Sequence, residues 1–335
     1  MNVLYTCDNN YIWLMGISAI SLFENNKHIS NLTVYLLGEH VSDESKKILR
    51  EIGIKYKRDI VVIDIPSLDI PERLVSARWP VSAFTRLFSG QLLPADMHKV
   101  LYLDCDTIIR GDIQPLNHID LSLSICGGVK DCIGKTYKEN IGLEGDDLYI
   151  NAGVVLLNLN ELRKIDIKTT IDTYMNQYLK LINYADQDIV NGIFAGRMAV
   201  LKPQYNGMTI TAVHGYDEIM RLRKPTNYYT MTEIEAAVSE PVIIHYTTNM
   251  NVVRPWFKNT DHPLEDEFRK YMDMSPWKDK QLDHMRFNSK ANKAINLIER
   301  MPKNMANSIL GLIHSELKPL YIRVKATKSL IAKRI

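Results

Sequence analysis

Short apolar strands and amphipathic helices alternate over the first 65 residues, and this alternation constrains the fold more than any other feature. Strand-like segments rich in apolar and β-branched residues span 1–8, 32–40 and 57–65. Helical spacing of apolar residues fills 11–26, and a second helix is expected over 42–53, opened by Ser42 and ended by Gly53. Strands joined through helices pair in parallel. The predicted class is α/β, with a mostly parallel central sheet and helices on both faces.

The pattern continues less regularly through the middle of the chain. Further strands are expected at 99–106, 121–131 and 241–249, and the segment 151–164 is expected to begin as a strand and turn into a helix. Helices are expected at 81–94, with Pro94 as the stop, and at 184–196, closed by Gly196.

Positive charge is concentrated in the last part of the chain. The 335 residues carry a net charge of +2, which says nothing about partners, and we expect no nucleic acid among them. From residue 281 onward, however, there are 11 Lys and Arg against 3 Asp and Glu. After Pro319 the apolar residues do not form a clean helical stripe. This basic, helical tail is predicted either to bind an anionic membrane surface or to pack on the preceding domain.

The remaining composition indicates a cytoplasmic protein. No run of about 18 apolar residues is present, so no transmembrane helix is expected. The N-terminus lacks the basic and apolar regions of a signal peptide. The four cysteines form no C-x-x-C pair, which is typical of a reducing compartment.

Two carboxylates follow the apolar strand "KVLYL", at Asp104 and Asp106. Ligands of open α/β sheets bind beyond the carboxyl ends of the strands. Carboxylates at that place suit Mg²⁺ or Mn²⁺, which also bind phosphate oxygens. A bare D-x-D is short and common, so on the residues alone the pair could also simply open the next turn.

Two competing motifs fit the sequence poorly. Haloacid-dehalogenase phosphatases carry a Thr or Val two places after the second Asp, where this chain has Ile108. The segment "GGVKDCIGKT" resembles a phosphate-binding loop, but five residues separate Gly128 from Gly134 where four are required. No G-x-G-x-x-G follows the first strand, so a classical dinucleotide fold is not supported either.

Six short motifs occur in an order that resembles glycosyltransferase family 8, the retaining sugar-nucleotide transferases. They are "TCDNNY", "SAFTRL", "LYLDCD", "YINAGVVLLNL", "YADQDIVNG" and "IIHY" followed by "RPW", and they cover about residues 1–257. The resemblance implies a GT-A fold, with a catalytic domain over 1–260 that binds nucleotide sugar and acceptor. Residues 261–335 would form a helical, basic C-terminal region with a possible role in membrane attachment.

The resemblance also implies a role for individual residues. The metal ligands would be Asp104, Asp106 and His245, holding Mn²⁺ or, alternatively, Mg²⁺. Gln187 and Asp186 would lie beside the anomeric carbon as the catalytic pair. Acceptor contacts would come from Asp131, Gln187, Thr247 and Thr248. The nucleotide sugar would contact Thr6, Asp8, Asn10, Tyr11, Arg86, Asp104, Cys105, Asp106, Asn151, Asp186 and Arg254.

One segment departs from the family pattern. Members commonly show H-x-x-G-x-x-K-P-W, whereas this chain reads "HYTTNMNVVRPW", with Arg254 in place of the lysine and nine steps from His245 instead of six. An arginine can still neutralise a β-phosphate. The longer loop leaves the position of that arginine open.

The function implied is transfer of a hexose, glucose or galactose, from a UDP-sugar to a hydroxyl of a glycan, glycolipid or glycoprotein. Front-face attack is preferred to a covalent intermediate, because the amide of Gln187 is a poor nucleophile. The expected place is the cytoplasm or the inner face of the plasma membrane. One alternative is a catalytically degenerate family member that binds sugar nucleotide or glycan without turnover. A haloacid-dehalogenase-like phosphatase is a less favoured alternative.

Overall fold

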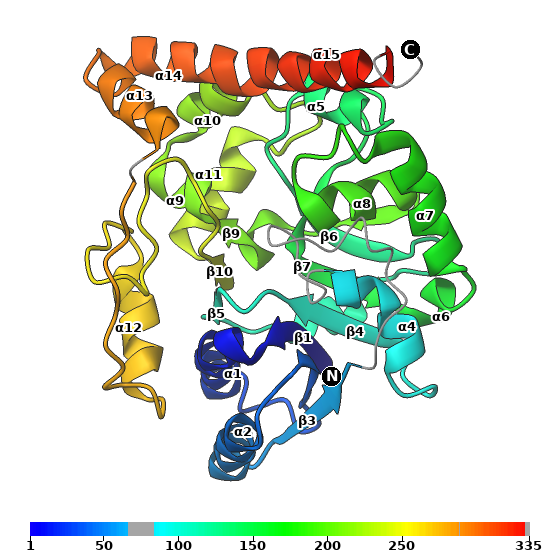
Figure 1. Ribbon diagram of the computed structural model, residues 1–335. Helices are drawn as coiled ribbons and strands as arrows, with labels where there is room; N and C mark the ends of the chain where they lie inside the picture. The colour runs from blue at the N-terminus through cyan, green and yellow to red at the C-terminus, as the bar shows by residue number, and fades with distance from the viewer. Residues whose placement is uncertain (66–83, 288, 332–335) are drawn as a thin grey trace.

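A seven-stranded sheet forms the centre of the molecule (Figure 1). The computed structural model describes residues 1–65, 84–287 and 289–331. The strand order is β3 (Asp59–Asp64), β2 (Thr33–Glu39), β1 (Asn2–Asp8), β4 (Lys99–Leu103), β7 (Ile150–Asn158), β6 (Cys126–Lys130) and β8 (Met198–Val200). All the strands are parallel except β7, which runs antiparallel to both of its neighbours. The predicted α/β class with a mostly parallel sheet is confirmed.

Helices cover both faces of this sheet because β1 and β4 are apolar on both sides. Val3 and Tyr5 pack in one core cluster with α1 (Ile12–Asn25) and α2 (Asp43–Tyr56). Leu4 belongs to a second cluster on the other face, beneath α7 (Ile167–Tyr178) and α8 (Ala185–Ile193). Successive strand residues point to opposite faces, so one strand supplies both cores. The helix predicted over 81–94 is found as two short helices, Arg86–Phe88 and α4 (Ser89–Leu92). Residues 81–83 lie outside the described residues.

The predicted end of the second helix at Gly53 is wrong. Helix α2 continues to Tyr56, and Lys57 then takes the left-handed conformation that ends it. Gly53 instead allows a close approach, because a Cβ there would lie 2.7 Å from the carbonyl oxygen of Arg58. The strands expected at 121–131 and 241–249 are also shorter than predicted, at Cys126–Lys130 and Ile243–His245.

A second, small sheet brings distant segments to the end of β4. It has the order β5 (Thr107–Ile109), β10 (Ile243–His245) and β9 (Gly207–Met208). The antiparallel register of β5 and β10 places His245 opposite Thr107. Strand pairing therefore carries residue 245 to the residue next to Asp106.

The C-terminal helices cross one end of the molecule, opposite α1 and α2 (Figure 1). They are α13 (Lys290–Ile298), α14 (Lys303–Leu312), a π-helical turn at Ile313–Leu317 and α15 (Lys318–Ile331). Helix α14 packs on α10 (Tyr216–Arg223), and α15 packs on α5 (Lys135–Asn140). The remaining short helices are α6 (Leu159–Leu162), α9 (Thr209–Val213), α11 (Met231–Ser239) and α12 (Glu265–Asp273).

Packing of the tail on the domain is specific. The Asn140 side chain donates to the carbonyl of Pro319 at 2.9 Å and accepts from Arg323 Nε at 2.8 Å. Gly311 lets α14 approach α10 so closely that a Cβ there would lie 2.0 Å from the carbonyl oxygen of Arg221. Helix α12 belongs to the main core through Phe268, and the predicted boundary at residue 260 remains a proposal.

Part of the outward side of the tail is apolar, and this stripe begins before Pro319, outside the segment for which no clean helical stripe was expected. Six exposed residues recur at helical spacing on the side opposite Gly311, Ser315 and Pro319: Leu312, Ile313, Leu317, Leu320, Tyr321 and Val324. The stripe starts before Pro319, and the continuous helix reveals it. Within the described part of the chain, no helix is long and apolar enough to cross a membrane.

Candidate functional site

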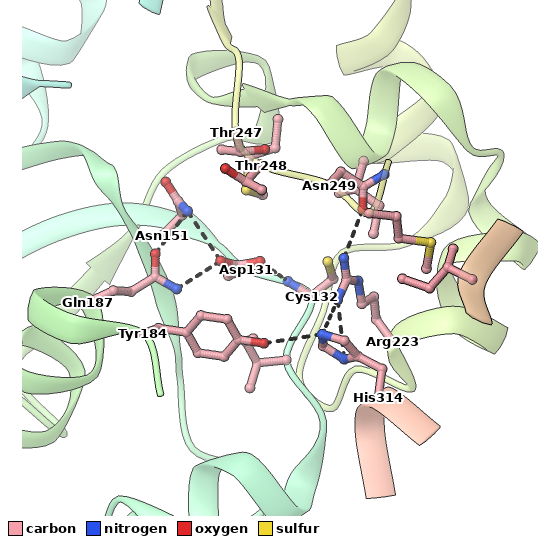
Figure 2. Close-up of a pocket in the computed structure, with 15 residues that line it drawn as sticks. Asp131, Cys132, Asn151, Tyr184, Gln187, Arg223, Thr247, Thr248, Asn249 and His314 are labelled. Carbon is pink, nitrogen blue, oxygen red and sulfur yellow. Dashed lines mark hydrogen bonds between the residues drawn. The ribbon is translucent and has the colours of Figure 1, made fainter. Parts of the chain in front are cut away.

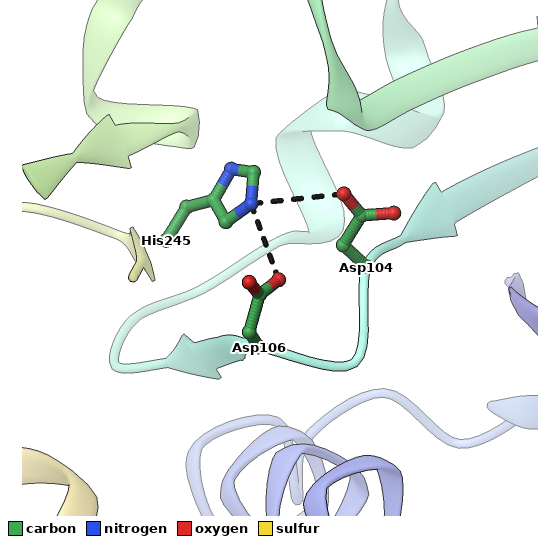
Figure 3. A group of neighbouring side chains, drawn as sticks. All are labelled: Asp104, Asp106 and His245. Atoms are coloured by element: carbon green, nitrogen blue, oxygen red, sulfur yellow. Dashed lines mark ion pairs between the residues drawn. The ribbon is translucent and has the colours of Figure 1, made fainter. Parts of the chain in front are cut away.

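Asp104, Asp106 and His245 form one cluster at the end of β4 (Figure 3). Each offers one ligand atom, and these atoms lie within 4.8 Å of one another. His245 Nε2 lies 3.2 Å from Asp106 Oδ1 and 3.7 Å from Asp104 Oδ2. The other oxygen of Asp104 accepts from the Tyr102 hydroxyl at 2.6 Å and from Arg86 at 3.0 Å. One oxygen of Asp104 is thus held in place, and the other faces the imidazole.

A chain of hydrogen bonds orients the imidazole of His245. Its Nδ1 lies 2.9 Å from Asn206 Oδ1, and Asn206 Nδ2 donates to Asn151 Oδ1 at 2.9 Å. Because the amide oxygen of Asn206 can only accept, Nδ1 carries a proton, and Nε2 is the ring nitrogen that faces the carboxylates and could bind a metal. This is the outer-shell arrangement typical of metal-binding histidines. The donor set therefore fits a divalent cation such as Mn²⁺ or Mg²⁺.

The protonation of the cluster reflects its charge. Burial alone would lower the pKa of His245, but the carboxylates of Asp106 and Asp104 raise it above its usual value. Burial would likewise raise the pKa of Asp106, but His245 and Arg254 lower it. The two pKa shifts are reciprocal, since the carboxylates favour a charged imidazole and the cations favour ionised Asp106.

Glycine is required at position 153, directly behind the cluster. A Cβ on Gly153 would lie 2.1 Å from the His245 ring and 2.8 Å from Asp104 Oδ2. The motif "INAGV" thus contributes its glycine as well as its asparagine to the site.

A cavity of about 240 Å³, here called the sheet-end cavity, opens beside this cluster. Its lining includes eight of the residues predicted to contact the nucleotide sugar: Thr6, Asp8, Tyr11, Arg86, Asp104, Cys105, Asp106 and Arg254. Tyr11 is half exposed at the rim, and the backbone of Asn10 donates to Asp8 Oδ1 at 2.8 Å. The structure therefore brings these segments together around one cavity, although they span some 250 residues of sequence.

Arg86 is a buried cation in the wall of the sheet-end cavity, and it pairs with two carboxylates. It is 7% exposed, stacks 3.9 Å from the ring centre of Tyr102, and pairs with Asp104 at 3.0 Å and Asp186 at 3.3 Å. Burial raises the pKa of Asp186 to about 6, against the opposing effect of Arg86. Arg86 is therefore no surface helix residue, and it ties the D-x-D motif to the D-Q motif.

A second cavity, of about 440 Å³ and here called the inner cavity, is lined by Gln187, the residue that follows Asp186 (Figure 2). All four residues predicted to contact the acceptor line it, namely Asp131, Gln187, Thr247 and Thr248, together with Asn151. The Gln187 amide oxygen accepts from Asn151 Nδ2 at 2.9 Å and from the backbone of Ala152 at 3.1 Å. Its nitrogen donates to Asp131 Oδ2 at 2.9 Å and to the Tyr149 hydroxyl at 3.2 Å. These bonds lock the orientation of the amide.

Asp188 supports the helix that carries Asp186 and Gln187. Its carboxylate accepts from the backbone of Asn183 and Tyr184, at 2.7 and 2.8 Å, and from the Tyr149 hydroxyl at 2.6 Å. It therefore secures the start of α8.

The lengthened loop leaves Arg254 at the sheet-end cavity. The Arg254 guanidinium lies 3.7 Å from Asp106 Oδ2 and stacks 4.5 Å from the ring centre of Trp256. The residues between His245 and Arg254 turn toward the tail, where Asn251 accepts from Asn292 of α13 at 2.8 Å. The loop lines the inner cavity with residues 247–250, while Arg254 lines the sheet-end cavity.

Several residues of the site carry no sequence signal. Asn206 lies on no motif, and Arg223, Asn249 and His314 line the inner cavity from three separate segments. Tyr102 could have been found, because residues two apart on a strand share a face and Tyr102 precedes Asp104 by two. The segment "GGVKDCIGKT" comprises the end of strand β6, a loop and the start of α5. The argument against a phosphate-binding loop therefore remains the spacing of Gly128 and Gly134.

Comparison with protein families identifies the class of this fold and site. The model of glycosyl transferase family 8 matches residues 2–260, so the chain belongs to that family. A lipopolysaccharide 1,2-glucosyltransferase of Escherichia coli K12 is 27% identical over 283 residues, which cover 83% of this chain and 79% of that protein. General stress protein A of Bacillus subtilis is 22% identical over 280 residues, 83% of this chain and 94% of that protein. The phosphatase alternative is thereby overturned.

The same fold occurs in solved structures. Galactosyltransferase LgtC, in complex with donor and acceptor sugar analogs, has a TM-score of 0.64 and 24% identity, covering 82% of this chain and 96% of that chain. Glycosyltransferase GlyE of Streptococcus pneumoniae has a TM-score of 0.59 and 23% identity, covering 82% and 60%. At these identities the likeness establishes the fold.

Proposed function

We propose that this protein transfers a hexose from a UDP-sugar to a glycan hydroxyl, with retention at the anomeric carbon and dependence on Mn²⁺. The observation that carries the proposal is the Asp104–Asp106–His245 cluster at the mouth of the sheet-end cavity, beside Arg86 and Arg254. The named activities of the relatives, lipopolysaccharide glucosyl and galactosyl transfer, support a hexose donor and a glycan acceptor.

The chain's own residues would divide the work between the two cavities. Asp104, Asp106 and His245 would hold the cation, which supplies positive charge to a diphosphate leaving group. Arg254 adds a second positive charge on the same side. Asp8 and Tyr11 at the rim suit a uracil base, which a tyrosine ring can stack upon.

The sugar would lie between Asp186 and Gln187. The Gln187 amide is a poor nucleophile, and its four hydrogen bonds hold it in one orientation, so we expect it to shape the sugar site and not to attack the sugar. Asp186 is held by Arg86 and would orient the sugar. We therefore favour front-face attack by the acceptor hydroxyl. Detection of a glycosyl adduct on Asp186 by mass spectrometry would contradict this mechanism.

The deciding experiment is donor turnover. Release of UDP is measured with UDP-glucose and UDP-galactose, with Mn²⁺, with Mg²⁺ and with EDTA. If UDP is released from only one of the two UDP-sugars, and only with a divalent cation, the experiment identifies both the donor and the metal. Binding of UDP-sugar without any release, and without transfer to a panel of glycans, would instead support the degenerate sugar-nucleotide-binding protein.

We also propose that the outward stripe of the tail attaches the enzyme to an anionic membrane surface. The apolar stripe is flanked by lysines such as Lys318 and Lys325, as expected of a helix lying in the interface. Sedimentation with anionic liposomes should decrease when Leu317 and Leu320 are changed to Glu. Leu123→Glu is the control, since Leu123 is 90% exposed and far from the tail in sequence. Equal sedimentation of all the proteins would rule out this attachment.

A further inference from the structure

The far end of the inner cavity contains a basic group that the proposed transfer reaction does not use. Arg223 is the last residue of α10, and its Nη2 donates to Asn249 Oδ1 at 2.8 Å (Figure 2). On its other side Nη1 lies 2.5 Å from His314 Nε2. Among the described residues no carboxylate forms an ion pair with Arg223, and its buried Nε has no hydrogen-bond partner. A partly buried guanidinium is thus left without a counter-charge.

Asn249 adds a second unused donor beside Arg223. Its side chain is 2% exposed, and the bond from Arg223 fixes the amide oxygen toward the guanidinium. The amide nitrogen then points away from Arg223, and within the described parts of the chain it has no hydrogen-bond partner. Buried donors are nearly always paired, so an unpaired donor on a cavity wall indicates a place for an acceptor atom of a ligand.

His314 holds the arginine without neutralising it. Burial, together with Arg223 and Lys318, lowers the pKa of His314 to about 2, so the ring is neutral and accepts from the guanidinium. His314 lies in the π-helical turn between α14 and α15, and π-helical turns recur at functional sites. It reaches the cavity because Gly311 seats α14 against α10.

The rest of the inner cavity should strengthen the attraction between Arg223 and an anion. Much of its wall is apolar, with Ile133, Ile210, Met250 and Ile295 among the lining residues. Asp131, the one carboxylate among the described residues that line the cavity, is bonded to Asn151 and Gln187 at the other end. The cavity therefore has a negative end near the reacting centre and a positive end at Arg223, and an apolar wall keeps such charges poorly screened.

We propose that Arg223 and Asn249 bind an anionic substituent, a phosphate or a carboxylate, on the acceptor glycan. Arg223 lines the cavity, and the planar guanidinium of an arginine matches either oxyanion in shape and charge. The acceptor hydroxyl would then point to Gln187 and Asp131, and the anion to the C-terminal helices. His314 is a positioning residue for Arg223. This inference rests on the proposed function, since it assigns the substrate class of the same site.

The test is binding of small charged sugars with the sheet-end cavity filled. UDP and Mn²⁺ are titrated first, and their binding reports on the proposed function alone. Glucose, glucose 6-phosphate and glucuronate are then titrated by calorimetry into the UDP- and Mn²⁺-bound protein, or into the unliganded protein if UDP does not bind. We expect one or both charged sugars to bind at least 10-fold tighter than glucose, since hydrogen bonds to charged groups are the stronger ones.

Matched variants assign that preference to Arg223. Arg223→Gln should weaken binding of the charged sugar about 10-fold or more, while Arg223→Lys keeps the charge, loses the fork and should fall between. Arg221→Gln, the same change two residues earlier on the exposed side of α10, should bind as the unaltered protein does. Should Arg223→Gln fail to fold, Arg223→Lys against Arg221→Gln carries the comparison.

Each outcome decides the proposal. A preference for glucose 6-phosphate alone identifies a phosphate-bearing acceptor, and a preference for glucuronate alone a carboxylate-bearing one. Equal binding of glucose and the charged sugars, no binding of any charged sugar, or equal effects of the Arg223 and Arg221 variants would overturn it. Should His314→Leu weaken charged-sugar binding and His314→Asn restore it, the effect lies in the hydrogen bond to Arg223. Equal losses in both would remove the positioning role.

Discussion

The two cavities of this enzyme are built from different kinds of sequence. The sheet-end cavity is lined by the short motifs, and its arginines are paired with carboxylates, Arg86 with Asp104 and Asp186 and Arg254 with Asp106. The inner cavity draws on α10, the loop after β10 and the C-terminal helices, and its arginine has no acidic partner among the described residues. The difference teaches that the sheet-end cavity, the proposed donor site, is built largely from local motifs, while the inner cavity, the proposed acceptor site, also draws on segments without a motif.

Loss of a carboxylate from the metal cluster should have the largest effect. Asp106→Asn keeps the shape of the side chain but removes the charge that faces His245, so UDP release and transfer should both fall about 10²- to 10³-fold. Stopped assays with Mn²⁺ measure both rates. Asp59→Asn, an exposed carboxylate at the start of β3, is the control. Mn²⁺-dependent turnover at the original rate in Asp106→Asn would show that the metal assignment is wrong.

Crowding of the Asp104–Asp106–His245 cluster should have the next largest effect, which is weaker Mn²⁺ binding at the proposed donor site. A Cβ at Gly153 would meet the His245 ring and Asp104, so Gly153→Ala should weaken Mn²⁺ binding about 10- to 100-fold. Paramagnetic resonance of free Mn²⁺ measures the affinity directly. Gly215→Ala is the matched control, because a Cβ there meets nothing within 4 Å. Equal Mn²⁺ affinities in the two variants would separate Gly153 from the metal site.

A change in the tail should affect the inner cavity alone. Gly311→Ala forces α14 away from the Arg221 carbonyl and so moves His314. Transfer to a glycan acceptor should fall about 10-fold, because small misplacements of binding groups are costly, while UDP release without acceptor changes little. Leu312→Ala, an exposed neighbour, is the control. If transfer and release fall together in Gly311→Ala, the tail also supports the sheet-end cavity and the contrast between the cavities is lost.

Acid should weaken the fold slightly through His262, which supports the inner cavity. Its Nε2 lies 3.1 Å from the Thr209 hydroxyl, and the backbone of Leu264 donates to its Nδ1 at 3.1 Å. Burial lowers the pKa of His262 to about 4. The neutral folded form is therefore stabilising above pH 6.5, and this contribution is lost as the pH falls from about 6.5 toward about 4.

Urea unfolding between pH 7.5 and 4.5 measures that loss. In the unaltered protein, His262 should contribute a slope of at most about 1.4 kcal/mol per pH unit to the free energy of unfolding. His262→Gln removes the titrating group, so its unfolding free energy should depend less on pH. Identical pH dependence in the two proteins would mean that His262 titrates alike in the folded and unfolded states.

The residues that line the sheet-end cavity could largely be predicted from the sequence, and those that line the inner cavity only in part. Strand periodicity and the D-x-D at a strand end predicted where Asp104 and Asp106 would lie. The same periodicity could have predicted that Tyr102 contacts Asp104. Asn206 could not have been predicted in this way, since it orients His245 from a loop 39 residues earlier. The exposed stripe on the tail was missed because it begins at Leu312, before the segment in which a stripe was sought.

By itself, the sequence determined the class of the sheet, the acidic pair at the end of β4 and the order of the family motifs, because strand and helix periodicities are local properties of the chain. Only the tertiary structure decided that Arg254, after a longer loop, lines the sheet-end cavity beside Asp106, and that Arg223, Asn249 and His314 meet in one cavity. Those outcomes depend on the register of β5 with β10 and on the close approach of α14 to α10 at Gly311. Contacts between segments so far apart in the chain leave no periodic trace in it.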